Sequence, residues 1–221
     1  LELNALAEDA IVSRGGKPAF KGYRGFPATL CTSVNEVVVH GIPGDLRLSE
    51  GDIVSIDIGT FYRGYAADQA ATFAVGDVSG EARRLLEVTE RSLTVGIAAA
   101  VAGRRLGDVS AAIQDVVETA GFWVIREFVG HGIGREFHEG PEVPNYGRAG
   151  TGPVLRPGLV LAIEPMVSLD KTTVSVADDG WTASTADGSL AAHFEHTVAI
   201  TEDGPRVLTA KAGTEGGAHG A

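Results

Sequence analysis

Leu48–Asp57, which reads LSEGDIVSID, decides the fold of this chain because it returns 107 residues further on. The second copy, Leu155–Glu164, reads LRPGLVLAIE. Each copy runs from Leu to Gly, through an apolar strand-like run and Ile, to a carboxylate. A His-Gly-Ile tripeptide precedes each copy, at His40 and at His131. Because a carboxylate is costly to bury without a partner, we interpret the pattern as two related half-domains that share one charged site.

The composition is that of one globular domain. The chain has 221 residues, of which 44% are hydrophobic, enough for a sizeable core. No apolar run approaches the roughly 20 residues that cross a bilayer, and the net charge of −11 argues against nucleic acid or an anionic membrane as a partner. Cys31 is the only cysteine, which excludes an internal disulfide framework and favours a reducing, cytoplasmic compartment.

Local patterns predict alternating helices and strands along both halves. The expected helices are Leu1–Ser13, Ser79–Val101 and Leu106–Ala120. The expected strands are Ile53–Gly59, Ala66–Val75, Phe122–Val129, Leu159–Leu169, Val174–Val176 and His193–Thr201. The second half begins with two helices and the first with one, so the repeat predicts a further helix ahead of residue 1. We expect a single catalytic domain over residues 1–212 and a disordered tail over residues 213–221.

The first strand pair is expected to be a hairpin that carries two aspartates. A turn centred on Tyr62 and Arg63 would place Asp57 directly opposite Asp68, with Cβ atoms roughly 5 Å apart. Two like charges so placed destabilise a hairpin unless a positive group lies between them. A one-residue bulge would break this register, and two separate solvent-facing aspartates are the alternative. The apolar residues around both positions favour a buried face.

The second half repeats this device with longer side chains. Glu164 ends its apolar strand, Glu195 lies on a returning strand, and His131 lies between glycines that leave room for close approach. Four carboxylates and one imidazole suit a pair of divalent first-row metals better than a structural zinc site. Two such ions would generate hydroxide near neutral pH and stabilise a tetrahedral intermediate. The candidate metal ligands are therefore Asp57, Asp68, His131, Glu164 and Glu195.

The other histidines are less decisive on spacing alone. His40 and His138 are as consistent with a structural role as with a catalytic one. His193 and His196 flank Glu195, and we expect both to point away from it, in supporting or structural roles.

Six motifs carry a resemblance that extends over nearly the whole chain. They are GFPATLCTSVNEVVVHGIP, GDIVSIDIG, GYAADQAATF, VGHGIGREFHEGPEV, LAIEPMV and DGWTASTADGSLAAHFEHTVAIT. In these motifs the chain resembles the type I methionine aminopeptidases of peptidase family M24. The resemblance implies an α+β pita-bread fold, in which a curved, mainly antiparallel sheet is backed by helices. Two pseudo-symmetric halves would surround a dimetal site.

The resemblance also implies an activity and roles for individual residues. The activity is removal of the initiator methionine from nascent polypeptides with a small second residue, by a monomer that could work near the ribosome. Two divalent ions (Co, Mn, Fe or Zn) would be held by the five ligands already named. Glu164 would also be the general base, and His40 and His138 would contact the substrate as catalytic residues. The residues that match the family's methionine pocket are Tyr23, Phe26, Cys31, Phe137 and Trp181, and Phe20 could join them.

Two other interpretations stay open from the sequence. Aminopeptidase P and prolidase share the fold and the ligand set, so an aminopeptidase P-like or dipeptidase activity is an alternative. The NEVVVHGIP segment and the short arm between Glu164 and Glu195 favour the methionine enzyme. A non-catalytic binding protein of the same fold is the second alternative, although such a relative would be expected to have lost ligands.

Overall fold

Both copies of the repeat contribute strands to one large sheet. The computed structural model describes residues 1–210. The predicted tail, residues 213–221, and the end of the predicted domain lie outside these residues. The strands of the large sheet are β1 (Lys17–Pro18), β2 (Leu30–Val34), β4 (Ile53–Tyr62), β5 (Tyr65–Ala74), β7 (Gly130–Gly132), β8 (Glu139–Val143), β9 (Val160–Ile163), β14 (Glu195–Thr201) and β15 (Gly204–Val207). All of its pairings are antiparallel.

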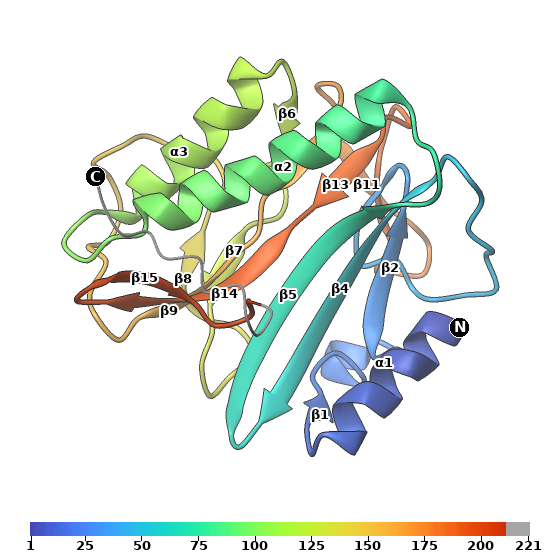
Figure 1. Ribbon diagram of the computed structural model, residues 1–221, viewed down its shortest axis with the longest axis horizontal. Helices are drawn as coiled ribbons and strands as arrows, with labels where there is room; N and C mark the ends of the chain where they lie inside the picture. Colours follow the sequence, from blue (N-terminus) through green and yellow to red (C-terminus); the bar gives the residue numbers. More distant parts are fainter. Residues whose placement is uncertain (211–221) are drawn as a thin grey trace.

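The order of these strands follows the repeat. The sheet runs β1-β4-β5-β14-β9-β7-β8, with β2 added beside β4 and β15 beside β14 (Figure 1). Strands β4 and β9 contain the two copies of the repeated pattern, and they flank β5 and β14 at the centre. In the order β4-β5-β14-β9, a strand with the repeated pattern is outermost on each side and its partner strand is inside it. This is the arrangement expected of two pseudo-symmetric halves.

The hairpin β4–β5 forms as predicted, but its register differs from the prediction. Its two-residue turn is Arg63-Gly64, both with positive φ (50° and 84°), which is the backbone of the tight hairpin turns that match strand twist. Asp57 consequently lies opposite Ala70, and Asp68 lies opposite Gly59. The two aspartates share one face but are diagonal neighbours, so the predicted direct opposition is wrong.

Two small sheets lie beside the large one. Two strands that the sequence suggested were continuous are divided between the large sheet and one of these small sheets. One small sheet consists of β13 (Ala191–His193), β10 (Met166–Ser168) and β6 (Trp123–Val124), and the other of β11 (Val174–Val176), β12 (Ala183–Thr185) and β3 (Val37–Val39). The predicted strand 159–169 breaks at Pro165, which has no N–H to donate to a ladder. The predicted strand 193–201 breaks at Phe194, where the chain passes from one sheet to another. Of the predicted strand 122–129, only β6 forms.

The helices match their predicted bounds to within two residues. They are α1 (Glu2–Ser13), α2 (Gly80–Ala99) and α3 (Leu106–Thr119), together with one short 3₁₀ turn, η1 (Tyr23–Gly25). The hydroxyl of Ser79 accepts a hydrogen bond from the N–H of Ala82 and so caps α2, which satisfies one free donor at its start. None of the helices within residues 1–210 combines the length and the apolar character needed to span a membrane.

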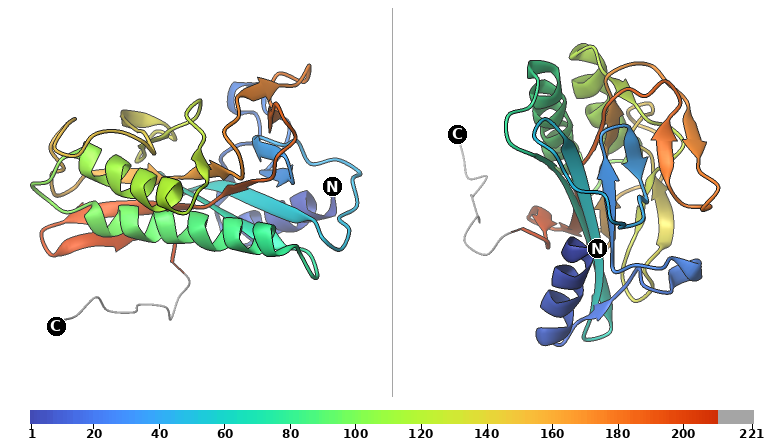
Figure 2. Two further views of the ribbon diagram at one scale, coloured as in Figure 1. Left: turned by 90° about the horizontal axis from the view of Figure 1, so that it is seen from above. Right: turned by 90° about the vertical axis from the view of Figure 1, so that its right-hand side faces the viewer.

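Helices α2 and α3 lie side by side against the large sheet (Figure 1). Leu93 of α2 and Ile113 of α3 pack with Leu161 of β9 in the largest apolar cluster. Ala71 of β5 packs on this cluster, whereas Ala66 packs on a second cluster with Phe20 and other aromatic residues. Alternate residues of a strand point to opposite faces. The side chain of Asp68 therefore faces away from α2, toward the side on which β11 and β12 lie (Figure 2).

Candidate metal centre

The five predicted ligands come from the middle of the large sheet. Asp57 lies within β4 and Asp68 within β5, Glu195 begins β14, Glu164 directly follows β9, and His131 is the central residue of β7. Glu195 pairs with Ala70 of β5, and His131 pairs with Ala162 of β9. The sheet ladder itself thus brings together residues from both halves of the chain.

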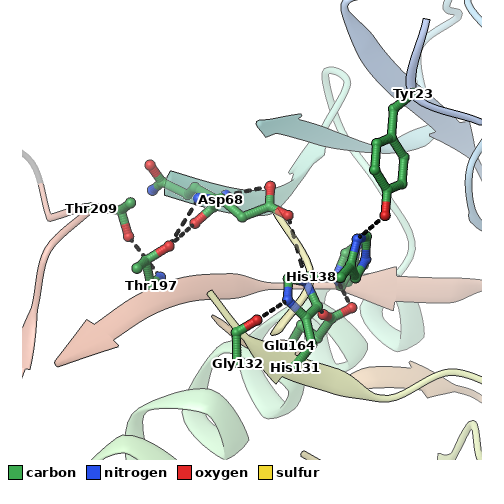
Figure 3. A network of polar contacts seen from close by, with 10 residues as sticks. Tyr23, Asp68, His131, Gly132, His138, Glu164, Thr197 and Thr209 are labelled. Atoms are coloured by element: carbon green, nitrogen blue, oxygen red, sulfur yellow. Dashed lines mark hydrogen bonds and ion pairs between the residues drawn. The ribbon is translucent and has the colours of Figure 1, made fainter. Parts of the chain in front are cut away.

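The ligand atoms converge on one point of the sheet. The Nε2 atom of His131 lies 3.6 Å from Oε1 of Glu164 and 3.9 Å from Oδ2 of Asp68 (Figure 3). One ligand atom each from Asp68, His131 and Glu195 lie within 4.8 Å of one another. All three of these residues are buried. Separations of this size leave room for a cation among the ligand atoms.

The charges at this point require a positive partner. Burial raises the pKa of Asp57, Asp68, Glu164 and Glu195, and the mutual repulsion of the carboxylates raises the pKa of Asp57, Glu164 and Glu195 further. Oδ1 of Asp57 and Oε1 of Glu195 are buried and accept no hydrogen bond from the described residues. Unpartnered buried carboxylate oxygens are costly, so the donor set fits divalent cations.

Hydrogen bonds hold several of these ligands from behind. Nδ1 of His131 lies 2.8 Å from the carbonyl oxygen of Gly132, and Nδ2 of Asn145 donates to the carbonyl oxygen of Glu164 at 3.0 Å. The hydroxyl of Thr197 accepts from the N–H of Asp68 and donates to its carbonyl oxygen, at 2.9 and 2.8 Å (Figure 3). Such contacts fix the orientation of ligands in metal sites.

The ligands form one wall of a cavity of about 170 Å³. Every site residue that the sequence suggested lines this cavity, which is bounded by Phe20, Tyr23, Arg24, Phe26, Cys31, His40, Asp57, Asp68, His131, Phe137, His138, Glu164, Trp181 and Glu195. Its aromatic part is closed by edge-to-face rings: Phe20 meets Phe137 at 5.4 Å between centroids, and Phe26 meets Trp181 at 5.2 Å. Gly59 contributes to the closure, because a Cβ there would overlap the rings of Phe20 and Phe137.

The two remaining predicted histidines line the cavity from different directions. The His40 ring contacts the edges of Phe128 and Trp181 at 5.4 and 6.2 Å between centroids, and burial lowers its pKa. His138 is exposed at the rim, next to the His131 ring. Desolvation, and then the neighbouring charge of His131, lower the pKa of His138 to about 4. Both imidazoles are neutral at pH 7.

The structure adds contacts at this site that the sequence did not indicate. Nε2 of His193 is buried, 3.8 Å from Oε2 of Glu164, which agrees with the supporting role expected of it but gives it a ligand partner that the sequence did not indicate. Residues two apart on an extended chain point to the same face. The spacing of His193 from Glu195 could therefore have indicated that the two side chains lie on one side of the sheet. Arg24 also lines the cavity, and no sequence signal marked it. His196 does lie elsewhere, with Nδ1 2.8 Å from the hydroxyl of Thr209.

Comparison with known proteins gives the class to which this site belongs. The Metallopeptidase family M24 matches residues 1–202, and the chain belongs to that family. It is 55% identical over 208 residues to a methionine aminopeptidase of Clostridium perfringens, covering 94% of this chain and 84% of the relative.

Solved structures agree with that class. The crystal structure of a methionine aminopeptidase from Thermotoga maritima matches with a TM-score of 0.93 and 51% identity, covering 94% of this chain and 84% of that one. A prolidase from Pyrococcus furiosus matches with a TM-score of 0.75 and 25% identity, covering 95% of this chain and 55% of that one. The α+β pita-bread fold predicted from the sequence is thereby confirmed.

Proposed function

We propose that this chain is a methionine aminopeptidase, which hydrolyses the N-terminal methionine from peptides and nascent proteins with a small second residue. One observation carries the proposal: five potential ligands, four of them buried and Glu164 half-buried, share a single cavity with an aromatic pocket. The identity of 55% to a curated methionine aminopeptidase over most of both chains supports the substrate.

The chain's residues fit two divalent ions. Asp57, Asp68, His131, Glu164 and Glu195 would hold them, because their buried oxygens are otherwise unpartnered or mutually repelling. When bound, such ions would polarise the scissile carbonyl and lower the pKa of water. The oxygen-rich donor set favours Mn²⁺, Fe²⁺ or Co²⁺, with Zn²⁺ as a further candidate.

The substrate's first residue is positioned where the two strands β2 and β4 meet. Cys31 lies opposite Asp57 in this ladder, so the pocket and the metal ligands are directly adjacent. A free α-amino group binds at Asp57 while the methionine side chain lies against Cys31 and the rings of Phe26 and Trp181. The flexible, polarisable thioether suits contacts with aromatic rings. This adjacency explains why only the first residue would be removed.

Three residues move or hold protons during hydrolysis. Glu164 accepts a proton from the attacking water as the general base. His138 donates a hydrogen bond to the carbonyl oxygen as negative charge develops on it. His40 hydrogen-bonds the scissile amide and supports departure of the new amine. The cavity also limits the second residue to small side chains, because the rings of Tyr23 and Trp181 lie at its sides.

The cellular setting follows from this activity. A methionine aminopeptidase meets its substrates as they leave the ribosome, so we infer that the protein acts in the cytoplasm on nascent chains. We also propose that it acts as a monomer.

A peptide panel tests the function. Protein reconstituted with Mn²⁺ should cleave a peptide that begins Met-Ala about 10–200-fold faster than one that begins Leu-Ala, the range that side-chain contacts usually supply. Met-Leu peptides should be poor substrates. Preferred cleavage of Ala-Pro peptides would instead establish the aminopeptidase P-like alternative, and no cleavage by metal-loaded protein would favour the binding protein.

A further inference from the structure

Two neighbouring histidines in the cavity have different partners at the same ring nitrogen. The rings of His131 and His138 lie 4.1 Å apart between centroids. Nδ1 of His131 lies 2.8 Å from the carbonyl oxygen of Gly132. Nδ1 of His138 lies 2.8 Å from the hydroxyl of Tyr23, a residue 115 positions away in the sequence (Figure 3).

The carbonyl partner fixes the tautomer of His131, and the phenol partner allows the opposite tautomer in His138. A carbonyl oxygen only accepts, so Nδ1 of His131 carries the proton and Nε2 keeps a free lone pair. That nitrogen faces Glu164 and Asp68, as a metal ligand must. A phenol both donates and accepts hydrogen bonds at neutral pH, and we assign it here as the donor. Donation from Tyr23 to Nδ1 of His138 leaves Nε2 of His138 as its N–H group.

The loop around Tyr23 holds the hydroxyl in place. The Tyr23 ring stacks on the His138 ring with 24° between planes and 5.4 Å between centroids, and it meets the Phe137 ring at 5.8 Å. The N–H of Tyr23 donates to the carbonyl of Phe20, and the carbonyl of Tyr23 accepts from the N–H of Phe26, at 2.8 and 2.9 Å. Ring packing therefore restricts the phenol, and backbone hydrogen bonds hold the turn that carries it.

We propose that Tyr23 is a positioning residue that holds His138 as the Nε2–H tautomer, opposite to the tautomer of His131. His138 is exposed at the rim, so without the phenol water would compete at both nitrogens and both tautomers would be populated. The second part of the proposal rests on the proposed function: the Nε2–H group donates to the oxygen of the scissile carbonyl. Tyr23 then has two roles: its ring lines the methionine pocket, and its hydroxyl orients a catalytic hydrogen-bond donor.

Nitrogen NMR tests the tautomers without any turnover. In ¹⁵N-histidine-labelled protein at pH 7.5, His138 should show a pyridine-type Nδ1 and a pyrrole-type Nε2. His131 should show the reverse pattern in the same metal-free sample. The His138→Ala variant assigns the His138 signals. In Tyr23→Phe, the His138 signals should move toward the average of the two tautomers. A pyrrole-type Nδ1 for His138 in the unsubstituted protein would overturn the proposal.

Kinetics of paired variants test the link to catalysis. Tyr23→Phe keeps the ring and should lower kcat for a Met-Ala peptide by about 10–100-fold, the usual effect of losing an orienting partner, with little change in KM. In a His138→Ala background the same substitution should have no further effect, because coupled residues are not additive. Tyr62→Phe, at the exposed tip of the β4–β5 hairpin, is the matched control. Equal losses in both backgrounds would assign Tyr23 to the pocket alone.

The two experiments separate failure of this proposal from failure of the proposed function. If the metal-loaded protein does not cleave Met-Ala peptides, the function is wrong, whereas the NMR result still decides the tautomers. If cleavage is normal and Tyr23→Phe is as active as the unsubstituted protein, the function stands and the positioning role of Tyr23 is wrong.

Discussion

The two halves of the molecule place carboxylates in the same way through different connections. In the first half, Asp57 and Asp68 lie on a hairpin closed by a two-residue turn. In the second half, Glu164 and Glu195 lie at the same end of the strand pair β9–β14. The chain between them forms β10, β11, β12 and β13, which belong to two other sheets. The ladder of β4, β5, β14 and β9 is nevertheless continuous. Strand pairing therefore positions the ligands, whatever the length of the connection.

The histidines of the two His-Gly-Ile segments differ more than the carboxylates do. His131 lies inside a strand of the large sheet and directs Nε2 toward Glu164 and Asp68. His40 follows β3 with a positive φ of 61°, and its ring lies against Phe128 and Trp181. The repeat thus supplies one imidazole to the candidate metal centre and one to the aromatic part of the same cavity. The two halves therefore share the strand ladder but place their repeated histidines differently.

Removing the metals should have the largest effect on activity. Metal binding should depend equally on the ligands from both halves. Chelated protein should lose its activity on Met-Ala peptides entirely and regain it with Mn²⁺. Folded protein should gain about 2.7 kcal/mol of stability at a metal concentration 100 times the Kd. Asp57→Asn and Glu195→Gln should each lower metal content, measured by elemental analysis. A chelated sample with full activity and an unchanged Tm would contradict the dimetal proposal.

Alanine variants of the histidines sharpen the contrast between the halves. His131→Ala should lose bound metal, with activity partly restored by excess metal. His138→Ala should keep its metal and lower kcat by about 10²–10³-fold, as removal of an oxyanion donor does. His40→Ala should also keep its metal and lose turnover. Metal stoichiometry measured beside kcat decides this, and the division of roles is wrong if His40→Ala loses metal as His131→Ala does.

The pocket provides a smaller test, since its rings come from both halves. Phe26 belongs to the first half and Trp181 to the second, and their rings meet at 5.2 Å between centroids. Phe26→Ala and Trp181→Ala should each reduce the preference for Met-Ala over Leu-Ala peptides, by about 1–3 kcal/mol or roughly 10–200-fold. Metal content should not change in either variant. If only one of them altered selectivity, the pocket would belong to one half.

The last expected effect is on stability and not on activity: a pH slope in the unfolding free energy of metal-free protein. Asp57, Glu164 and Glu195 have raised folded pKa values, so their stabilisation is complete below the unfolded value and is lost as the pH rises through the folded one. The lowered pKa values of His131 and His193 oppose this only below their ordinary value of 6.5. Above that pH, the free energy of unfolding should fall by about 1.4 kcal/mol per pH unit for each proton that the folded chain holds and releases on unfolding.

Urea unfolding between pH 6.5 and 8.5 measures this slope. Mn²⁺-saturated protein is the comparison, because bound cations keep the carboxylates ionised throughout. Asp57→Asn and Glu195→Gln should each reduce the slope of the metal-free chain, one substitution in each half. A stability that rises with pH over this range would contradict the raised pKa values.

Prediction from the sequence succeeded where the signal was local. The apolar runs before Asp57 and Glu164 indicated strands β4 and β9, although β4 continues beyond Asp57 to Tyr62. The Ser79 cap indicated the start of α2. Prediction failed where a single backbone conformation mattered. Arg63 adopts a positive φ beside Gly64, which moves the turn by one residue and converts a direct pair of aspartates into a diagonal one. A preference for glycine at that turn was visible in the sequence, but the conformation of Arg63 was not.

The sequence by itself determined the five candidate ligands and the two-fold repeat, because side-chain periodicity and a repeated pattern are written along the chain. The resemblance of its motifs to a known family implied the fold class. Only the tertiary structure decided which groups meet across it. It placed His193 against Glu164 after a change of sheet at Phe194, and it brought the phenol of Tyr23 to His138. Contacts between residues so far apart depend on register, strand breaks and loop packing together, and no local pattern encodes their combination.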